Sequence, residues 1–268
     1  MKKILRQRCT ALIVNFNSPI GLFSDLINVL ANCSLIDSVN ILFNGGQTEA
    51  YLSDFDKFTL NNQKINKFFS ENNGYAAGQN LLASKVDSEY LLLINPDIIT
   101  NNKDLSYFLK IGFSHNFDLL APLLTSPSGD IYPSCRRLPF ILDHVFRFVN
   151  LDPFNYIKNK EFNKNGFCSC DFLSGALWLV SGEKYNSING FDERYFLYME
   201  DIDFCRKLKK SGSAVTYTNN VRFIHCHGDG VRKSFRLFSY FLISIIYYYS
   251  KGAYCAVSNL WKRDRRSF

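Results

Sequence analysis

The chain has 268 residues, of which 47% are hydrophobic, 16% aromatic and 21% charged. These values are those of a folded globular protein, and the length suits one large α/β domain with at most a small appendage. The net charge of +7 equals the excess between Val231 and Phe268, where eight Lys or Arg accompany one acid. The rest of the chain is neutral. Such a basic tail indicates a polyanionic partner, either a membrane surface or nucleic acid.

The cysteines and the two apolar runs favour a cytoplasmic protein. Cys168 and Cys170 are too close for the usual C-x2-C zinc spacing, so we expect the eight scattered cysteines to be buried reduced thiols. Asn15 and Asn17 interrupt the N-terminal apolar run, which is therefore too short for a signal peptide. The longest uncharged run, 237–249, is shorter than the ~20 residues that a membrane-spanning helix needs.

Strands and helices alternate along the first ~125 residues. Apolar runs predict strands at 10–16, 39–43, 64–69, 90–94 and 119–124, and helical spacing predicts helices at 20–30, 76–84 and 104–113. This alternation predicts an open, mostly parallel sheet with helices on both faces. Ligands bind beyond the carboxyl ends of the strands in such sheets. Four of those ends are polar loops, at 15–17, 44–46, 72–74 and 95–97.

The second half is less regular. We expect strands at 172–180, 214–218 and 221–224, and helices at 181–188 and 201–210. The loop 133–139 is basic and carries Arg136 and Arg137, which could help to bind a substrate or could be solvated. We divide the chain into a domain at 1–230, whose halves meet near residue 125, and a basic, aromatic helical extension at 231–268.

Three groups of side chains have catalytic potential. Asp97 follows a buried strand, where it could bind Mg²⁺ together with substrate phosphates or merely cap a turn. Glu200 and Asp201 stand at a helix start, where a carboxylate could act as a general base or simply complement the helix dipole. His225 and His227 face the same side of a strand, as metal ligands or as an ordinary histidine pair.

Taken together, these motifs resemble one known family. The blocks NNGYAAGQN, LLLINPD, GFDERYFLYMEDIDFC and RFIH occur in this order, between residues 72 and 225. In them the sequence resembles glycosyltransferase family 2, which has the GT-A fold, and is most similar to rhamnosyltransferases of bacterial O-antigen and cell-wall polysaccharide assembly. The resemblance runs from Ala11 to about Lys251, and the block around Glu200 and Asp201 is its most specific part.

The resemblance implies a role for each matching residue. Asp97 and His225 would bind Mg²⁺ or Mn²⁺ at the donor diphosphate, His227 being the less favoured histidine. Asp201 would be the general base, with Glu200 beside it. The positions that match the donor site are Asn17, Asn44, Asn73, Gly74, Gly78 and Asn95. One departure affects base selectivity, because Phe43 stands where the family usually has an acid that contacts the nucleotide base.

The implied activity is inverting transfer of a sugar from a nucleotide donor to a lipid-linked glycan in lipopolysaccharide or related synthesis. The expected donor is dTDP-β-L-rhamnose; a UDP- or GDP-linked sugar is the alternative. We expect the basic tail to hold the protein on the inner face of the cytoplasmic membrane, and no nucleic-acid motif accompanies it. A nucleotidyltransferase would usually carry a basic first loop, which is absent here. A non-catalytic glycan-binding or assembly protein would not need Asp97, Asp201 and His225 together.

Overall fold

The computed structural model of the chain describes residues 8–59, 62–141, 143, 162–226 and 235–264, with side chains in the last helix described as far as Lys251. In chain order the elements are β1 (Cys9–Asn15), α1 (Ile20–Asn32), β2 (Ser38–Asn44), α2 (Glu49–Thr59), β3 (Ile65–Ser70), α3 (Tyr75–Ala83), β4 (Tyr90–Ile94), β5 (Ile98–Ile99), α4 (Asn102–His115), β6 (Leu119–Thr125), β7 (Cys135–Arg136), β8 (Phe167–Ser169), β9 (Phe172–Leu173), β10 (Leu177–Ser181), α6 (Gly182–Ser187), α7 (Glu200–Lys210), β11 (Val215–His225) and α8 (Phe235–Asp264).

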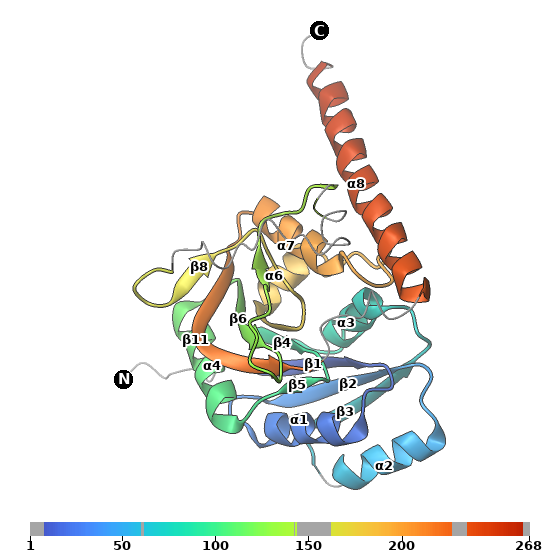
Figure 1. Cartoon of the computed structure of the whole chain (residues 1–268), viewed down its shortest axis with the longest axis vertical. Helices are drawn as coiled ribbons and strands as arrows, with labels where there is room; N and C mark the ends of the chain where they lie inside the picture. The colour runs from blue at the N-terminus through green and yellow to red at the C-terminus, as the bar shows by residue number, and fades with distance from the viewer. Residues whose placement is uncertain (1–7, 60–61, 142, 144–161, 227–234, 265–268) are drawn as a thin grey trace.

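A mixed sheet forms the centre of the molecule (Figure 1). Its strand order is β3-β2-β1-β4-β10-β6-β11-β5, with β8 paired to β11. Strands β1 to β4 run parallel, as do β6 and β11, whereas β10 runs antiparallel to both of its neighbours. The predicted α/β class and the mostly parallel sheet are therefore confirmed.

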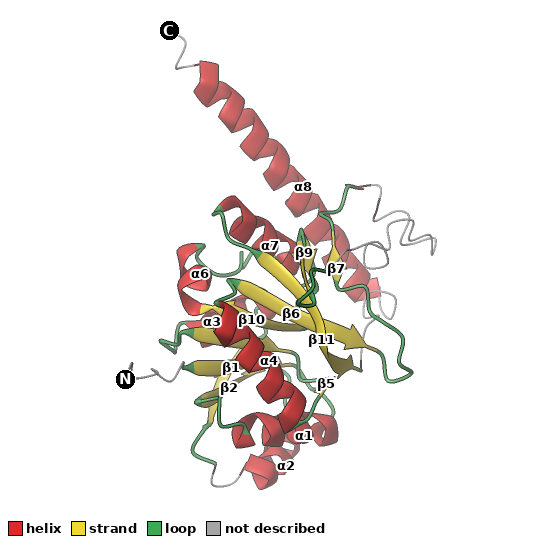
Figure 2. Ribbon diagram, turned by 90° about the vertical axis from the view of Figure 1, so that its left-hand side faces the viewer, coloured by secondary structure: helices red, strands yellow, loops and turns green. Residues whose placement is uncertain are grey.

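Helices cover both faces of the sheet and bury a separate hydrophobic core on each. One core places side chains of α1 and α4, together with Phe55 of α2, against the sheet. The other contains side chains of α3, α6, α7 and the first half of α8, with Trp178 at its centre. Figure 2 shows the helices on the two sides of the strands. Because both faces are covered, strands such as β1 and β4 are buried along their whole length.

Helix α8 packs on the molecule with its first half and then projects away from it (Figures 1 and 2). Phe241, Ile245 and Tyr248 are buried, and the Ser244 hydroxyl donates to the carbonyl of Leu197. No helix in the part of the chain that the structure describes is both long and apolar enough to cross a membrane.

Several predicted elements need correction. The expected strand at 172–180 is two strands, β9 and β10, because the chain turns at Ser174 and Gly175 and β9 pairs with β7 instead of entering the main sheet. The two strands expected at 214–218 and 221–224 are one strand, β11, which stays paired with β6 across an irregularity between Thr218 and Arg222. Helix α2 was not predicted, because only Phe55 and Thr59 of its residues are buried and its apolar pattern is weak.

The cysteine prediction is also wrong in part. Cys135 and Cys170 form a disulfide, because the pairing of β7 with β9 brings these two parts of the chain together. Cys9, Cys33, Cys168 and Cys205 are buried thiols, as expected. Burial raises the pKa of the Cys9 and Cys205 thiols well above the ordinary value, which keeps them protonated.

Candidate active site

Asp97 and His225 meet at one end of the sheet. The Nε2 atom of His225 lies 3.3 Å from Oδ1 of Asp97, and both side chains are largely buried, at 12% and 14% exposed. The short strand β5 pairs antiparallel with the end of β11, so that His225 faces Ile98 in the ladder. The backbone N–H of Cys226 also donates to the carbonyl of Asp97. The structure thus brings together two residues that the sequence predicted to share a metal site.

Glu200 and Asp201 begin helix α7, which carries three acids in its first turn and three lysines in its last. This distribution complements the helix dipole at both ends. Tyr198 and Met199, which precede the helix, both have positive φ angles, of 69° and 67°. Such a conformation costs a non-glycine residue ~1–2 kcal/mol. Backbone strain of this kind is concentrated at functional sites, where the surrounding structure holds it in place.

Asp201 is held in a defined orientation by two backbone N–H groups. Its Oδ1 accepts from the N–H of Ile202 at 2.8 Å, and its Oδ2 accepts from the N–H of Gly175 at 3.3 Å. Gly175 belongs to the turn between β9 and β10. A side chain at Gly175 would press against the Cβ of Asp201, 3.2 Å away, so a glycine there allows the turn to approach the carboxylate.

Tyr75 links the two acidic groups. Its hydroxyl donates to the carbonyl of Gly175 at 3.3 Å, and its backbone N–H donates to the carbonyl of Phe196. Burial raises the pKa of Tyr75, and the carboxylates of Glu200, Asp201 and Asp97 raise it further. The turn at Gly175 brings these groups into one region, because Gly175 donates to Asp201 and the next residue, Ala176, accepts from the N–H of Asn95, two residues before Asp97.

Glu200 is the more deeply buried member of the acidic pair. It is 8% exposed, and its Oε2 has no hydrogen-bond partner among the described residues. Burial, and then the charge of Asp201, raise the pKa of Glu200 from 4.5 to about 8. Glu200 is therefore mostly protonated at neutral pH while Asp201 lies beside it, an arrangement that separates the roles of two adjacent carboxyl groups.

The loop after β3 closely approaches the segment that precedes α7. Gly74 has a φ of 92°, and a Cβ there would lie 2.3 Å from the carbonyl oxygen of Phe196. Only glycine fits both constraints. The Asn44 amide donates to the carbonyl of Gly74 and to Asn72, and its oxygen accepts from Ser70. In this structure Asn44 thus fixes the loop that carries Asn73 and Gly74, and its direct contact with a donor stays a prediction.

The remaining predicted donor residues are positioned by the sheet. Asn17 follows β1 and adopts a φ of 54°. Its side-chain amide donates to the carbonyl of Gly46, and this bond joins the loop after β1 to the loop after β2. Asn95 donates its backbone N–H to Ala176 and lies partly buried between β4 and β5. Gly78 has a packing role, because a Cβ there would lie 2.9 Å from Val14 and would push α3 off the sheet.

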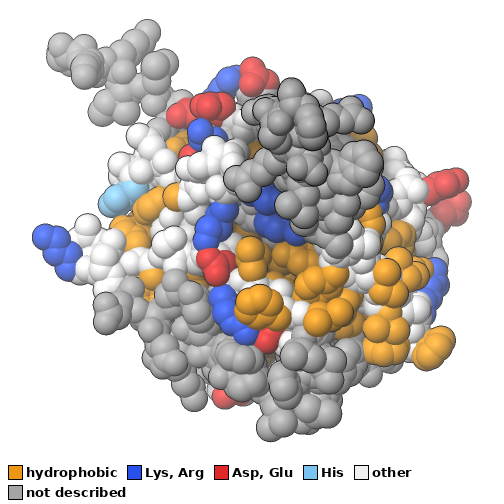
Figure 3. Space-filling view, turned by 90° about the horizontal axis from the view of Figure 1, so that it is seen from above, with side chains coloured by type: hydrophobic (Ala, Val, Ile, Leu, Met, Phe, Trp, Pro, Cys, Tyr) orange, Lys and Arg blue, Asp and Glu red, His pale blue; other side chains and the backbone are white. Residues whose placement is uncertain are grey.

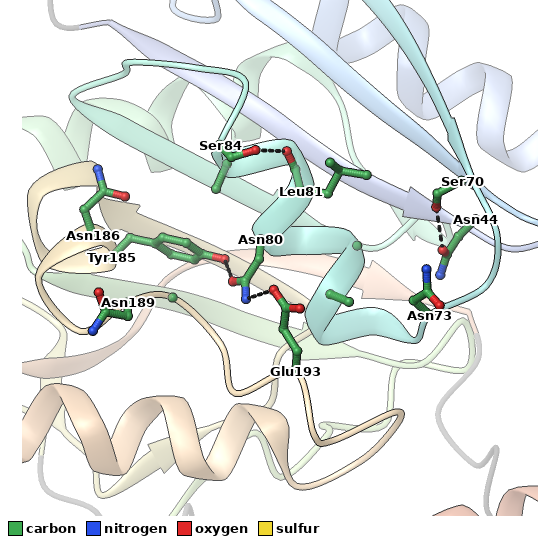
Figure 4. A pocket seen from close by; sticks show the side chains of 14 residues that line it. Asn44, Ser70, Asn73, Asn80, Leu81, Ser84, Tyr185, Asn186, Asn189 and Glu193 are labelled. Atoms are coloured by element: carbon green, nitrogen blue, oxygen red, sulfur yellow. Dashed lines mark hydrogen bonds between the residues drawn. The ribbon is translucent and has the colours of Figure 1, made fainter.

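A hollow of about 640 Å³ lies beside α3 (Figure 4). Asn44, Asn73 and Gly78 line it from one side, and the segment from Tyr185 to Glu193 closes it from the other. Within it Asn80 bonds to Tyr185 and to Glu193, which fastens α3 to that segment. Asp97, Asp201 and His225 are not among its lining residues. The hollow therefore adjoins the loop that carries Asn73 and Gly74 and lies apart from Asp97 and Asp201.

The basic loop is turned toward the protein. Arg137 forms an ion pair with Asp143 at 2.7 Å, and Arg136 donates to the carbonyl of Pro133.

His227 lies outside the described residues. Sequence reasoning missed Tyr75, Gly175 and Tyr132, whose ring packs edge-on against His225. Tyr75 could have been suspected because it follows Gly74 directly, at the start of α3. No motif in the sequence marks Gly175 or Tyr132.

Curated glycosyltransferases are similar to the chain in sequence. No family model matches the chain. Rhamnosyltransferase WbbL of Escherichia coli K12 is 31% identical over 150 residues, which cover 53% of this chain and 54% of that protein. N-acetylglucosaminyl-diphospho-decaprenol L-rhamnosyltransferase of Mycobacterium tuberculosis is 27% identical over 150 residues, which cover 53% and 49%. Hexosyltransferase Agl10 of low-salt glycan biosynthesis in Haloferax volcanii is 25% identical over 158 residues, which cover 58% and 49%. The chain spans about half the length of these curated relatives.

Solved structures share the fold. GalNAc-T7, crystallised with UDP, GalNAc and Mn²⁺, aligns with a TM-score of 0.63 at 10% identity, over 82% of this chain and 44% of that one. Residues 1–349 of S. aureus TarS, in complex with UDP, align with a TM-score of 0.57 at 14% identity, over 83% and 61%. At these identities the likeness concerns the fold alone.

The mixed, mostly parallel sheet flanked by helices is the GT-A fold of these glycosyltransferase structures. The sequence likeness makes the assignment more specific. The chain is similar in sequence to rhamnosyltransferases and to a hexosyltransferase, in agreement with the resemblance to family 2 glycosyltransferases that its motifs show.

Proposed function

We propose that the chain is an inverting glycosyltransferase that transfers a sugar from a nucleoside diphosphate to a glycan acceptor. The observation that carries this proposal is the convergence of Asp97, His225 and Asp201 on one end of the sheet, around Tyr75. Two of these groups suit a metal, and the third suits a general base. A binding protein of the same fold would have no need of all three.

Asp97 and His225 fit a divalent cation. They offer a carboxylate oxygen and an imidazole nitrogen only 3.3 Å apart, from side chains that are largely shielded from water. Mg²⁺ and Mn²⁺ are commonly held by one or two protein ligands together with substrate phosphates. When bound, such an ion would neutralise the charge that develops on the diphosphate leaving group. The partial burial of both side chains strengthens their electrostatic interaction with it.

Asp201 is our choice for the general base. The N–H groups of Ile202 and Gly175 each donate to one of its oxygens and hold the carboxylate in place. It can thus accept the proton of an acceptor hydroxyl as that oxygen attacks the sugar carbon from the side opposite the diphosphate. This geometry inverts the configuration of the carbon. Proton transfer to a positioned base contributes ~10²–10⁴-fold to the rate.

The proposed donor is dTDP-β-L-rhamnose and the product an α-L-rhamnoside. Two observations support the choice: WbbL and the mycobacterial relative are both named rhamnosyltransferases. The decaprenol in the name of the mycobacterial relative supports a lipid-linked glycan acceptor here too. The second candidate is a UDP- or GDP-hexose donor, which is favoured by the hexosyltransferase relative and by UDP in the structural neighbours.

We also propose that the protein works in the cytoplasm, on the inner face of the membrane. Along its first half α8 buries one face, but it also exposes an apolar stripe formed by Leu242, Ile243 and Ile246. Figure 3 looks at the end of the molecule from which α8 projects and shows hydrophobic side chains gathered near Lys and Arg. Such a surface suits the boundary of an anionic bilayer, where each basic residue adds ~1 kcal/mol. Arg265 and Arg266 of the basic tail lie outside the described residues.

A donor screen tests the function. Purified protein is incubated with dTDP-rhamnose, UDP-hexoses and GDP-sugars in Mg²⁺ or Mn²⁺, and release of the nucleoside diphosphate is measured. We expect release from dTDP-rhamnose above all. Turnover of a UDP-sugar with none of dTDP-rhamnose would leave the fold-level assignment intact and would refute the rhamnosyl specificity. No release from any donor, with or without acceptor lipid, would favour a non-catalytic role.

A further inference from the structure

A buried cluster of three cysteines lies outside the catalytic site. Cys135 comes from β7, Cys168 from β8, and Cys170 follows β8 directly. They are 0%, 6% and 1% exposed, and their sulfur atoms all lie within 4.8 Å of one another. Cys135 and Cys170 are joined as a disulfide, and the sulfur of Cys168 lies 3.9 Å from that of Cys135. A single cross-link needs two cysteines, so the third one requires an explanation.

The spacing suits a thiophilic metal. Zn²⁺ binds cysteine sulfur at ~2.3 Å in a tetrahedral arrangement, which separates neighbouring sulfurs by about 3.8 Å. The Sγ atoms of Cys135 and Cys168 are 3.9 Å apart. The three sulfurs come from segments that other contacts hold in place, since the N–H of Cys170 donates to Val215 and Cys168 faces Tyr217 in the β8–β11 ladder. The site is therefore largely formed before any metal enters.

Two buried hydroxyls beside the cluster supply an independent observation. Ser134, which precedes Cys135, and Tyr217, which faces Cys168, are 2% and 0% exposed. The Tyr217 hydroxyl interacts with the Ser134 side chain and with the sulfur of Cys168, and neither hydroxyl has a hydrogen bond to any further described group. A metal bound by three sulfurs needs a fourth ligand, and an oxygen from either hydroxyl, or from a water that it holds, would supply it.

We propose that the reduced protein binds one Zn²⁺ ion at Cys135, Cys168 and Cys170, and that the Cys135–Cys170 disulfide is the metal-free, oxidised form of the site. Two molecules of a small thiol reduce the disulfide: they form their own disulfide and leave two cysteine thiols. Zn²⁺ then replaces the thiol protons of the three cysteines, which are released to solvent. The ammonium of Lys209, which also pairs with Asp171, donates to the carbonyl of Cys170 and places a cation next to the site.

The site would stabilise the part of the chain that orients the general base. Cys170 leads into β9, and after it the turn at Gly175 donates to Asp201. The disulfide and the metal are alternative cross-links between β7 and this segment. The inference does not depend on which sugar is transferred, and metal binding can be measured without any donor.

The test is metal binding by the whole chain. Protein is reduced with a non-thiol phosphine, freed of reductant without oxygen, and titrated with Co²⁺ and then Zn²⁺. We expect one Co²⁺ per chain with sulfur-to-metal charge-transfer absorption in the near ultraviolet, displaced by Zn²⁺. Cys168→Ser should weaken Zn²⁺ binding by more than the ~10–100-fold that loss of an outer-shell partner costs. The matched control is Cys33→Ser, another buried cysteine, which should bind as the wild type does.

Oxidised wild-type protein provides a comparison that needs no variant, so a folding defect in Cys168→Ser would not leave the question open. We expect the oxidised chain to give no charge-transfer band. Absence of the band in the reduced wild-type protein, or an equal band after oxidation, would overturn the proposal. An unchanged band in folded Cys168→Ser would do the same. Loss of glycosyl transfer with intact metal binding would instead count only against the proposed function.

Discussion

The imidazole of His225 lies 3.3 Å from the carboxylate of Asp97, although the two residues come from opposite halves of the chain. The contact exists because β5, the two-residue strand that follows Asp97, pairs with the end of β11. The two proposed metal ligands are therefore brought together by a pairing within the sheet. Asp201 reaches the same region from the start of α7, where it accepts from the N–H of Gly175 in the turn before β10.

Replacement of Asp201 by Asn should separate binding from chemistry. The amide keeps the shape of the side chain but cannot take a proton, so we expect turnover to fall by ~10²-fold or more with donor affinity nearly unchanged. Steady-state kinetics and donor titration measure the two effects. The control is Asp130→Asn, in an exposed turn, which should leave both values unchanged. If Asp201→Asn weakened donor binding and kept turnover, Asp201 would be a binding residue.

Glu200 should make stability depend on pH. Its pKa is raised from 4.5 to about 8, chiefly by burial. Between these values the folded chain keeps a proton that the unfolded chain has lost, so the free energy of unfolding falls as pH rises, and the loss is complete above about pH 8. Glu200→Gln removes this titration. Its stability relative to wild type, measured in urea, should increase with pH by up to ~1.4 kcal/mol per unit. A flat difference between pH 5 and 8 would show that Glu200 titrates normally.

Lys251 should stabilise the junction between α8 and α7. Its ammonium lies 2.6 Å from Asp192 and 2.9 Å from Asp203, whose side chains are only 8% and 1% exposed. Burial alone would raise the pKa of Asp192, but hydrogen bonds from Arg194 and Lys251 lower it well below its ordinary value.

Lys251→Met leaves these buried carboxylates short of a partner and should lower the free energy of unfolding by about 3 kcal/mol. Urea denaturation measures the change. The matched control is Lys57→Met, because Lys57 pairs with Asp54 at the surface, where the loss should stay below ~1 kcal/mol. Equal effects of the two substitutions would mean that the Lys251 contacts do not stabilise the junction.

The exposed stripe of α8 should mediate membrane binding. We expect the full chain to sediment with anionic vesicles at low salt and to be released as salt rises. Replacing Ile243 and Ile246 together by Ser should reduce binding at least ~10-fold, since each buried isoleucine contributes ~1.5–3 kcal/mol. Ile131→Ser changes an equally exposed isoleucine on a loop and should have no effect. If the intact protein stays in the supernatant at low salt, the stripe is not a membrane surface.

The sequence predicted the elements whose signal is local. Strands β1 and β4 are mostly apolar because both of their faces are buried, and polar loops follow their carboxyl ends. Helix α2 gave no such signal, since most of its surface faces solvent. The turn at Gly175 was read as part of a strand, because apolar residues stand on both sides of it and only the pairing of β9 with β7 reveals the break.

The sequence predicted the individual residues of the candidate site better than the contacts between them. Asp97, Glu200 and Asp201 stand at element boundaries that motifs reveal. The contact of Asp97 with His225 depends on the β5–β11 pairing, which two residues of sequence cannot specify. The left-handed conformations of Tyr198 and Met199 are likewise invisible, because non-glycine residues adopt them only where the surrounding structure requires it. The approach of Gly74 to Phe196 belongs to the same class of tertiary contact.

The most direct test of the account is the dependence of nucleoside diphosphate release on divalent cations, measured for wild type, Asp97→Ala and His225→Ala. We predict that the wild-type chain needs Mg²⁺ or Mn²⁺ and that excess EDTA stops it reversibly. Asp97→Ala should lower the rate at least ~10²-fold at any metal concentration, as expected for a lost source of transition-state stabilisation. His225→Ala should mainly raise the metal concentration needed for half-maximal rate. Full wild-type activity in excess EDTA, or an Asp97→Ala variant with wild-type rate and metal dependence, would contradict the account.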